Sequence, residues 1–510
     1  MNVSNWLEKH ADFQPEKIAL RIFKDPQSEE TWNYSFLCER SRSWAKGLKH
    51  ISGVGRGDRV AFLGYNHPDM LALMFACARL GAILVPLNWR LAPPEHAFIS
   101  KNAEIHVLIV EKDFIVHAQA IKDSVPECDL VSLDFFSNGW ISHTDLMESE
   151  GLDDSNPNVG HESPWMIVYT SGTTGHPKGA VLTQEALFWN ALNSIHLHEL
   201  RHTDRILSVL PFFHVGPLNI QTTPALYVGA EVVMCPRFDP ELTLNLIDST
   251  RPDLLLLVPV TMQALLRNPM WEQTDFSCLR LVVTGSSVVP QNLIEGFHQR
   301  GVPVGQVYGS TETTPIAAVL RKEDAYSKAG STGKPALHCD VKIVDDSGME
   351  LPPHESGELW VKGPNLMFEY WGDPKATSEA FREGWFQSGD IGFRDEEGFI
   401  TINDRKKDII ISGGENIYPA EVESILRKLD AVADVAVVGR KDPDWGEVPF
   451  AYIELKSGMT FDEMETRKIC SEQLARFKNP KSYIVLEQLP RNTMGKVLKY
   501  QLRENAKTLN

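Results

Sequence analysis

Strand-like and helix-like patterns alternate through the first 330 residues, and this alternation restricts the fold more than any other feature of the sequence. Apolar residues recur at helical spacing over 35–50 and 69–80, and two prolines at 93 and 94 begin another helix. Short apolar runs typical of buried strands lie at 59–63, 82–86, 165–169, 205–210, 254–260 and 280–283. Strands that alternate with helices form a parallel sheet covered by helices. We therefore predict an α/β fold.

The chain has 510 residues, which is enough for two or three domains. Strand patterns and turn signals dominate between about 340 and 403, and they predict a β-rich subdomain. The charged run at 404–408 precedes a shorter segment with its own alternation of strands and helices. We predict a large N-terminal domain of stacked αβ subdomains over 1–404 and a small α+β C-terminal domain over 405–510.

The acidic balance of the chain restricts its partners. Its formal net charge is −18, so it has no excess of Lys and Arg to displace the counterions of a nucleic acid, and we predict no nucleic-acid partner. The apolar stretch Leu71–Leu87 is interrupted by Arg79, so we expect no integral membrane segment.

The cysteines and the N-terminus predict a cytoplasmic protein. Seven cysteines are scattered without the C-x-x-C spacing of a zinc or redox site, which favours reduced structural thiols. Residues 1–14 are polar and lack the apolar core of a signal peptide. The sequence leaves open whether the protein is a monomer or a homodimer.

The segment Thr170–Gly179 follows an apolar strand and precedes a helical pattern that starts at Gln184. It reads TSGTTGHPKG, so glycines, hydroxyls and one lysine stand where a phosphate-binding loop needs them. It is not the common phosphate loop, because neither Gly-Lys pair of the chain, at 333–334 and 495–496, is followed by Ser or Thr. On composition alone, a flexible surface loop is the favoured interpretation.

A second polar segment, Tyr308-Gly309-Ser310-Thr311-Glu312, follows another expected strand. As structure alone it is a turn and a helix cap. As a site, Tyr308 offers a ring for stacking on a purine, Thr311 a hydroxyl for phosphate, and Glu312 a carboxylate suited to Mg²⁺.

Together these motifs resemble the adenylate-forming superfamily, which includes acyl-CoA synthetases, firefly luciferases and peptide-synthetase adenylation domains. The resemblance implies that Tyr308 stacks on adenine, Thr311 contacts the α-phosphate, Glu312 binds Mg²⁺, and Gly285 and Ser286 flank the adenine and the acyl pocket. The residues that the resemblance assigns to ATP binding also include Thr170, Ser171, Gly172, Thr173, Thr174, Gly175, Lys178 and Gly309.

The resemblance extends beyond residue 380. In the segment W-F-Q-S-G-D, it assigns the ribose hydroxyls to Asp390, although an aspartate after a glycine also fixes a turn. Arg405 matches an arginine that contacts the ribose. Lys407 falls on the pivot that makes the small C-terminal domain mobile, although a charged run is most often a solvated connector.

The C-terminal part carries the expected coenzyme A contacts and the expected catalytic lysine. Ser412, Gly413 and Gly414 match a loop that lines the thiol channel. Arg476 and Lys478, with Lys481, form a basic cluster that suits the phosphates of coenzyme A or, equally, a soluble surface. Lys496 ends P-R-N-T-M-G-K, which matches the family lysine that bridges the substrate carboxylate and the α-phosphate; by itself a lysine in a turn has no such meaning.

The resemblance implies an AMP-forming acid–thiol ligase that uses ATP, Mg²⁺ and coenzyme A. Coenzyme A is the favoured acceptor, a separate carrier protein is the alternative, and a luciferase-like oxygenase is disfavoured. A nucleotide-binding sensor without catalysis would lack Lys496 or Glu312, and both are present.

The identity of the carboxylic acid substrate is the part of the predicted function that the sequence determines least. His214 is either a loop histidine satisfied by the backbone or, as the resemblance implies, a residue beside the acyl-acceptor region. The candidate pocket residues are mostly apolar and include no Lys or Arg, so we predict a lipophilic monoacid, with a medium- or long-chain fatty acid first and an aryl acid such as a hydroxycinnamate as the alternative. They are Phe213, His214, Val215, Pro217, Leu218, Ser287, Val307 and Pro315.

Overall fold

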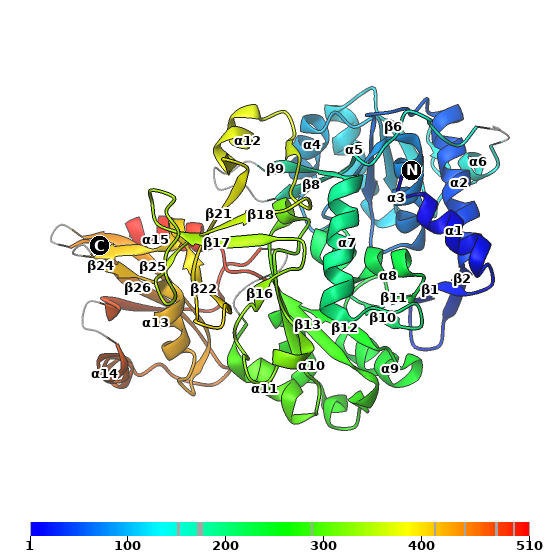
Figure 1. The fold of residues 1–510 in the computed structure, drawn as a ribbon. Coiled ribbons are helices and arrows are strands. Elements are labelled where there is room, and N and C mark those ends of the chain that lie inside the picture. The colour runs from blue at the N-terminus through cyan, green and yellow to red at the C-terminus, as the bar shows by residue number, and fades with distance from the viewer. Residues whose placement is uncertain are drawn as a thin grey trace. The chain divides into compact units, whose positions relative to one another are not determined.

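A computed structural model describes residues 2–149, 153–170, 177–286, 289–412, 415–442, 445–474, 478–492 and 495–508. The chain forms two compact units (Figure 1). The first unit comprises Met1–Val341 and Val361–Phe386, and the second comprises Lys342–Trp360 and Gln387–Asn510. The predicted α/β fold class is confirmed, whereas the domain boundary at 404/405 stays a prediction.

A nine-stranded sheet in the first unit has the order β16-β15-β14-β13-β12-β10-β11-β1-β2. Its six central strands, from β14 to β1, pair in parallel, and antiparallel strands complete both edges. The strands are β1 (Ile18–Phe23), β2 (Glu29–Asn33), β10 (Arg205–Ser208), β11 (Glu231–Met234), β12 (Leu254–Leu257), β13 (Leu281–Gly285), β14 (Val304–Tyr308), β15 (Ala318–Leu320) and β16 (Lys334–Pro335).

An eight-stranded sheet in the same unit has the order β19-β9-β8-β4-β3-β5-β6-β7. The strands from β8 to β7 pair in parallel, and β9 and β19 add an antiparallel edge. The strands are β3 (Arg59–Leu63), β4 (Ile83–Pro86), β5 (Val107–Val110), β6 (Asp129–Ser132), β7 (Ile141–Ser142), β8 (Pro164–Thr170), β9 (Lys178–Thr183) and β19 (Glu369–Tyr370).

Helices connect and cover these two sheets. Helix α7 contacts β9 of the eight-stranded sheet, and it also contacts helix α8 (Figure 1). Helix α8 in turn contacts β11 of the nine-stranded sheet. Helix α3 is buried along its whole length. The helices are α1 (Asn5–Phe13), α2 (Tyr34–Ile51), α3 (Pro68–Leu80), α4 (Pro93–Asn102), α5 (Ile115–Ser124), α6 (His143–Met147), α7 (Gln184–His198), α8 (Thr223–Val228), α9 (Pro240–Thr250), α10 (Pro259–Leu266), α11 (Gln291–Gln299) and α12 (Pro374–Ala380). Short single turns are η1 (Lys112–Phe114), η3 (Pro269–Glu272), η4 (Phe276–Cys278), η5 (Thr311–Thr313) and η6 (Lys322–Asp324), and η2 (Pro217–Thr222) is a short π-helix.

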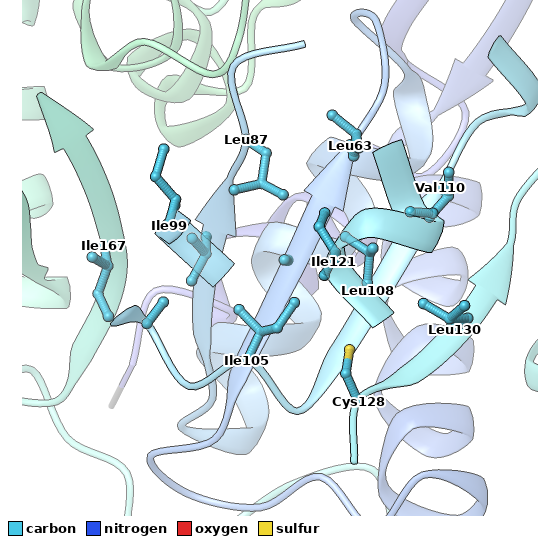
Figure 2. Packing of buried hydrophobic residues seen from close by; sticks show 14 of the residues in the cluster. Leu63, Leu87, Ile99, Ile105, Leu108, Val110, Ile121, Cys128, Leu130 and Ile167 are labelled. Atoms are coloured by element: carbon cyan, nitrogen blue, oxygen red, sulfur yellow. The ribbon is translucent and has the colours of Figure 1, made fainter. Parts of the chain in front are cut away.

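Helices α4 and α5 cover one face of the eight-stranded sheet, and the apolar side chains between them form a continuous core. Figure 2 shows Ile121 of α5 beside Leu108 of β5, and Ile99 of α4 beside Leu87, which follows β4; all four are buried members of one cluster. Truncating a side chain of this kind to alanine costs about 2–5 kcal/mol of stability. This core makes the sheet a rigid support for the loops at its edge.

The second unit carries most of one five-stranded sheet and all of another. The first has the order β17-β18-β21-β20 with β22 paired to β21, and the second has the order β24-β23-β26-β25 with β27 paired to β26. Their strands are β17 (Asp340–Val344), β18 (Gly357–Lys362), β20 (Phe381–Arg382), β21 (Trp385–Arg394), β22 (Ile400–Arg405), β23 (Ile410–Ser412), β24 (Glu415–Ile417), β25 (Val432–Asp442), β26 (Gly446–Leu455) and β27 (Ser482–Leu486). The single turn η7 (Lys406–Asp408) and the helices α13 (Pro419–Leu426), α14 (Glu463–Gln473) and α15 (Lys499–Thr508) complete the unit.

Two local predictions need correction. The strand expected over 254–260 ends at Leu257, because Pro259 opens α10. The expected order of strand, phosphate-binding loop and helix is also wrong, because β9 lies between the loop and α7. Helix α7 begins only after Thr183, whose side chain accepts a hydrogen bond from the Ala186 amide and caps the helix.

Among the described segments, none of the helices combines the length and the hydrophobicity that a membrane crossing needs.

Candidate active site

The carboxyl ends of β13 and β14 bring four of the predicted nucleotide residues together. The two strands are neighbours, and Gly285 pairs with Val307. Strand β13 ends at Gly285 and is followed by Ser286, which has a left-handed φ of 73°. Strand β14 ends at Tyr308 and is followed by Gly309. This is the edge at which open α/β sheets bind their ligands.

Two glycines at this edge are required by close backbone approach. A Cβ atom on Gly285 would lie 2.4 Å from the Val307 carbonyl oxygen, and a Cβ atom on Gly309 would lie 1.6 Å from the Pro315 carbonyl oxygen. Contacts below 3.0 Å to a backbone oxygen force the backbone to move. Both glycines therefore fix the shape of the segment that carries Thr311 and Glu312.

A buried asparagine that was not predicted from the sequence anchors the backbone that follows Thr311 and Glu312. Asn365 donates to the Thr313 carbonyl at 2.6 Å and to the Ile316 carbonyl at 2.8 Å. The Ile316 amide in turn donates to Asn190 of α7 at 3.1 Å. Thr311 and Glu312 lie in the single turn η5 between these anchors and Tyr308, so their backbone positions are set by buried hydrogen bonds.

The predicted phosphate-binding loop connects two paired strands. Thr170 ends β8, Lys178 begins β9, and the two residues lie directly opposite one another. The Thr170 hydroxyl lies 3.4 Å from the Lys178 carbonyl oxygen. Ser171, Gly172, Thr173, Thr174 and Gly175 lie outside the described residues, so their assignment to ATP stays a prediction.

One tyrosine contacts both Lys178 and Glu312. The Tyr370 hydroxyl donates to Glu312 Oε1 at 2.7 Å, and the Lys178 ammonium lies 5.2 Å from the centre of the Tyr370 ring. The Met367 amide also donates to the Glu312 carbonyl at 2.7 Å. The end of the phosphate-binding loop and the predicted metal-binding carboxylate therefore share a neighbour.

This arrangement fits a magnesium ion that is held mainly by nucleotide phosphates. Glu312 is half-buried, and its carboxylate provides the hard oxygen ligand that Mg²⁺ prefers. The described residues contain no cluster of three or more His, Cys, Asp or Glu side chains that could hold a metal. A single carboxylate suits Mg²⁺, because the ion commonly takes one or two carboxylates plus phosphate oxygens and water.

The predicted acyl-pocket residues lie at two strand ends of the nine-stranded sheet. Val215 and His214 follow β10, and Val307 and Pro315 lie in or after β14; the two valines and Pro315 are buried. Ser287 lies outside the described residues. The role of all these residues in acid binding stays a prediction.

Aromatic rings gather around His214. Its ring centroid lies 4.3 Å from that of Phe213, and Trp89, which follows β4 of the other sheet, packs edge-on against Phe213 at 6.2 Å. The guanidinium of Arg90 lies 4.7 Å from the Trp89 ring and 6.0 Å from the Phe213 ring. Arg90 is thus a cation beside the ring of Phe213, whereas the predicted absence of Lys and Arg from the acyl pocket stays a prediction.

Burial keeps His214 neutral. Desolvation, together with the positive charge of Arg90, lowers the pKa of His214 to about 3. The Nε2 atom is buried and has no hydrogen-bond partner among the described residues. His214 is therefore a neutral ring beside Phe213 at physiological pH and not a general acid.

We expect the pH profile of the enzyme to be independent of His214. Replacing His214 with Asn should lower kcat/KM for the acid about 3- to 10-fold, since a ring contact is lost, while the shape of the profile between about pH 5.5 and 8.5 stays the same. The measurement is kcat/KM against pH for both proteins. An inflection near the ordinary histidine pKa that disappears in the variant would contradict this prediction.

In the second unit, the predicted ribose residues lie opposite one another. Asp390 of β21 pairs with Arg405 of β22. Asp390 is buried, and its amide donates to the Ser388 hydroxyl at 3.1 Å, which in turn donates to the Leu359 carbonyl at 2.7 Å. The Arg405 side chain is outside the described part of the chain, so the ribose assignment stays a prediction.

Lys496 stands on a tight turn that local hydrogen bonds define. The Asn492 amide donates to the Lys496 carbonyl at 2.8 Å, and the Lys496 amide donates to Asn492 Oδ1 at 2.9 Å. Arg491 donates to the Gly495 carbonyl at 3.1 Å and pairs with Asp434 at 2.5 Å. Lys496 is exposed, and its catalytic role stays a prediction.

The predicted coenzyme A residues and the predicted hinge are only partly described. Ser412 is buried at the end of β23, and Lys478 contacts both carboxylate oxygens of Glu421 at 2.8 Å. Gly413, Gly414, Arg476 and the Lys407 side chain lie outside the described residues. The neighbours of Lys407 are anchored, since Asp404 accepts from the Ala420 amide at 3.0 Å and Lys406 pairs with Asp346 at 2.9 Å.

Comparison with models of known protein families shows to which family the chain belongs. The profile described as AMP-binding enzyme matches residues 7–371, and the profile described as AMP-binding enzyme C-terminal domain matches residues 421–496. The chain belongs to the AMP-binding enzyme family. The resemblance drawn from the motifs is thereby confirmed, and so is the prediction of an enzyme.

Individual relatives span nearly the whole chain. An indoleacetate–CoA ligase of Aromatoleum aromaticum is 47% identical over 99% of this chain and 98% of its own. A long-chain-fatty-acid–CoA ligase of Mycobacterium tuberculosis is 35% identical, with 99% and 98% covered. The o-succinylbenzoate CoA synthetase of Bacillus subtilis, solved with its acyl-adenylate OSB-AMP, has a TM-score of 0.87 and 33% identity over 98% of both chains. Relatives named as CoA ligases confirm the predicted class of acid–thiol ligase.

Proposed function

We propose that the protein activates a lipophilic aryl carboxylic acid with ATP and transfers the acyl group to coenzyme A, releasing AMP and pyrophosphate. The observation that carries the proposal is the contact of Tyr370 with both Lys178 and Glu312. It joins the end of a phosphate-binding loop to a carboxylate suited to Mg²⁺. The family and the acyl-adenylate bound to the Bacillus subtilis relative support the same chemistry.

In the first half-reaction, a carboxylate oxygen of the acid attacks the α-phosphorus of ATP, and the bond to pyrophosphate breaks. Both reactants are anions, so the enzyme must neutralise charge and align the reacting atoms. Lys178 and the loop before it hold the outer phosphates, Thr311 contacts the α-phosphate, and Lys496 neutralises charge between the carboxylate and the α-phosphate. Mg²⁺, which Glu312 would hold, neutralises charge on phosphate oxygens when bound.

In the second half-reaction, the coenzyme A thiol loses its proton to solvent and the thiolate attacks the acyl carbon, so that AMP leaves. A thiolate is a strong nucleophile, and the protein needs mainly to supply a channel and an orientation. We assign the channel to Ser412, Gly413 and Gly414 and the rotation between the two half-reactions to a hinge at Lys407. The seven free cysteines suit the cytoplasmic location that we include in the proposal.

The choice of an aryl acid reverses the order of preference drawn from the sequence. Trp89, Phe213 and His214 form a group of rings, and aromatic pairs gain stabilisation beyond simple burial. The Trp89 indole nitrogen and His214 Nε2 are buried without partners among the described residues, so they suit a substrate ring that carries a polar group. The 47% identical relative is named for indoleacetate, whereas the relative named for long-chain fatty acids is less similar.

A panel of acids tests the proposal. We expect indoleacetate, phenylacetate and ferulate to give kcat/KM at least about tenfold above octanoate and palmitate, a difference of the size that hydrophobic contacts supply. Replacing Trp89 with Leu should reduce the ratio of kcat/KM for the aryl acids to kcat/KM for the fatty acids. The assay follows AMP, pyrophosphate and thioester with ATP, Mg²⁺ and coenzyme A.

The outcomes of this panel separate the alternatives. Preference for palmitate would favour the fatty-acid alternative and would overturn the aryl assignment. Pyrophosphate release without a coenzyme A thioester would favour a carrier protein as acceptor. A folded protein that releases no pyrophosphate with any acid of the panel would overturn the proposed function.

A further inference from the structure

Tyr370 stands between two groups that belong to the proposed site but come from distant parts of the chain. Its hydroxyl donates to Glu312 Oε1 at 2.7 Å, and its ring lies 5.2 Å from the Lys178 ammonium. Lys178 makes no salt bridge with any of the described residues, and its ammonium lies over the Tyr370 ring. One side chain therefore contacts both the predicted metal ligand and the predicted phosphate ligand.

The sheet explains why Tyr370 reaches both groups. Strand β19 pairs antiparallel with β9, and Tyr370 lies opposite Ala180. Lys178 is two residues from Ala180 and faces the same side of the sheet, so it is the diagonal neighbour of Tyr370, within reach of an aromatic ring and a long side chain. The register of two strands thus sets the contact with Lys178.

The backbone around Tyr370 is firmly held. The Phe368 amide donates to the Val181 carbonyl at 2.8 Å, and the Trp371 amide donates to the Gly179 carbonyl at 2.7 Å. The Tyr370 amide donates to the Thr377 hydroxyl at 2.9 Å. A phenol on such a frame can hold the Glu312 carboxylate in one rotamer.

We propose that Tyr370 is a positioning residue that sets the Glu312 carboxylate for Mg²⁺ and the Lys178 ammonium for the outer phosphates of ATP. This inference rests on the proposed function and adds a residue to its site. A carboxylate has two oxygens; the phenol hydrogen-bonds to Oε1, and Oε2 would be the oxygen left to hold the metal. A hydrogen bond to a metal-binding side chain orients that side chain, and its loss typically lowers the metal affinity 10- to 100-fold. For a half-buried group such as Glu312 we expect the lower end, about tenfold.

The hydroxyl and the ring have separate tasks, and two variants separate them. Tyr370→Phe removes the hydrogen bond to Glu312 and keeps the ring beneath Lys178. Tyr370→Leu removes both, and the loss of the cation–π contact should raise KM for ATP by a further factor of about 2–5. A merely structural tyrosine would change stability without such a division.

The test measures metal binding directly as well as catalysis. Electron paramagnetic resonance gives the affinity of Mn²⁺ for the enzyme with ATP in the absence of acid, when no adenylate can form. We expect Tyr370→Phe to weaken Mn²⁺ binding about tenfold and to raise the Mg²⁺ concentration for half-maximal pyrophosphate release by the same factor. The value of kcat at saturating Mg²⁺ should approach that of the wild type.

Tyr65→Phe is a matched control. The Tyr65 hydroxyl donates to Asp113 Oδ2 at 3.2 Å, and the Arg237 guanidinium lies 4.8 Å from the Tyr65 ring. This variant therefore deletes the same kind of hydrogen bond, next to the same kind of cation–π contact, away from the nucleotide residues. We expect its Mn²⁺ affinity to equal that of the wild type.

A double variant shows whether Tyr370 acts through Glu312. In the Glu312→Gln background, Tyr370→Phe should cause no further loss of Mn²⁺ affinity. An unchanged Mn²⁺ affinity in Tyr370→Phe, or an equal loss in both backgrounds, would overturn the inference and leave the proposed function standing. A wild-type enzyme whose ATP complex binds no Mn²⁺ would overturn the proposed function itself.

Discussion

Replacing Lys496 with alanine is expected to abolish adenylation while leaving thioester formation from preformed acyl-AMP nearly intact. The exposed lysine stands on a turn whose shape comes from Asn492 and Arg491, so its loss should not disturb the fold. Its ammonium group is needed only where the acid attacks ATP, because in that step two anions approach one another. The rate of pyrophosphate release should fall at least about 10²- to 10³-fold, the loss typical of a group that stabilises developing charge.

The two half-reactions can be measured separately. Pyrophosphate release from ATP and acid reports adenylation, and the formation of acyl-CoA from synthetic acyl-AMP reports thioesterification. Lys468, an exposed residue of α14 in the same unit, provides a control, and Lys468→Ala should leave both rates unchanged. An equal loss of both half-reactions in Lys496→Ala would show that the lysine has a structural or general binding role.

The site residues that could be predicted from the sequence are those that lie close together in one short segment of the chain. Tyr308, Thr311 and Glu312 are neighbours in the chain, and an apolar strand before them places the segment at a carboxyl edge. The same holds for Gly285, which ends the next strand of the sheet. Periodicity and turn chemistry are local, so they were sufficient for these residues.

Contacts between distant segments were not predictable in this way. Tyr370 lies 58 residues after Glu312 on a strand of two residues, which has no periodicity to detect. Asn365 is one asparagine in a loop until three-dimensional structure brings it to Thr313. Trp89 did carry a signal, because it follows β4 at the edge where ligands bind, and it could have been added to the pocket.

Strand β9 was missed for a physical reason as well. It begins Lys-Gly-Ala, and these residues have weak strand propensity. The strand forms because β8 and β19 pair with it on both sides, so tertiary pairing overrides propensity. This pairing matters for the site, because the pairing of β9 with β19 places Lys178 beside Tyr370.

Replacing Gly309 with alanine should be the most damaging small change among the residues assigned to the nucleotide. The added Cβ would lie 1.6 Å from the Pro315 carbonyl oxygen, so the backbone between them, which carries Thr311 and Glu312, must move. A displacement of about 1 Å at a catalytic group costs on the order of 10²-fold in rate. We expect kcat/KM for ATP to fall by about that factor, with a stability loss of about 1–3 kcal/mol from the forced shift.

Gly55 allows this effect to be distinguished from the general cost of a glycine-to-alanine change. A Cβ there would lie 3.7 Å from Asp58 Oδ2, an ordinary van der Waals distance, so Gly55→Ala should retain wild-type kcat/KM for ATP. Thermal unfolding of both variants separates activity lost through a moved segment from activity lost through unfolding. If Gly309→Ala kept its full kcat/KM for ATP, the segment from Gly309 to Pro315 would not need its observed shape, and the nucleotide roles assigned to Thr311 and Glu312 would lose their structural basis.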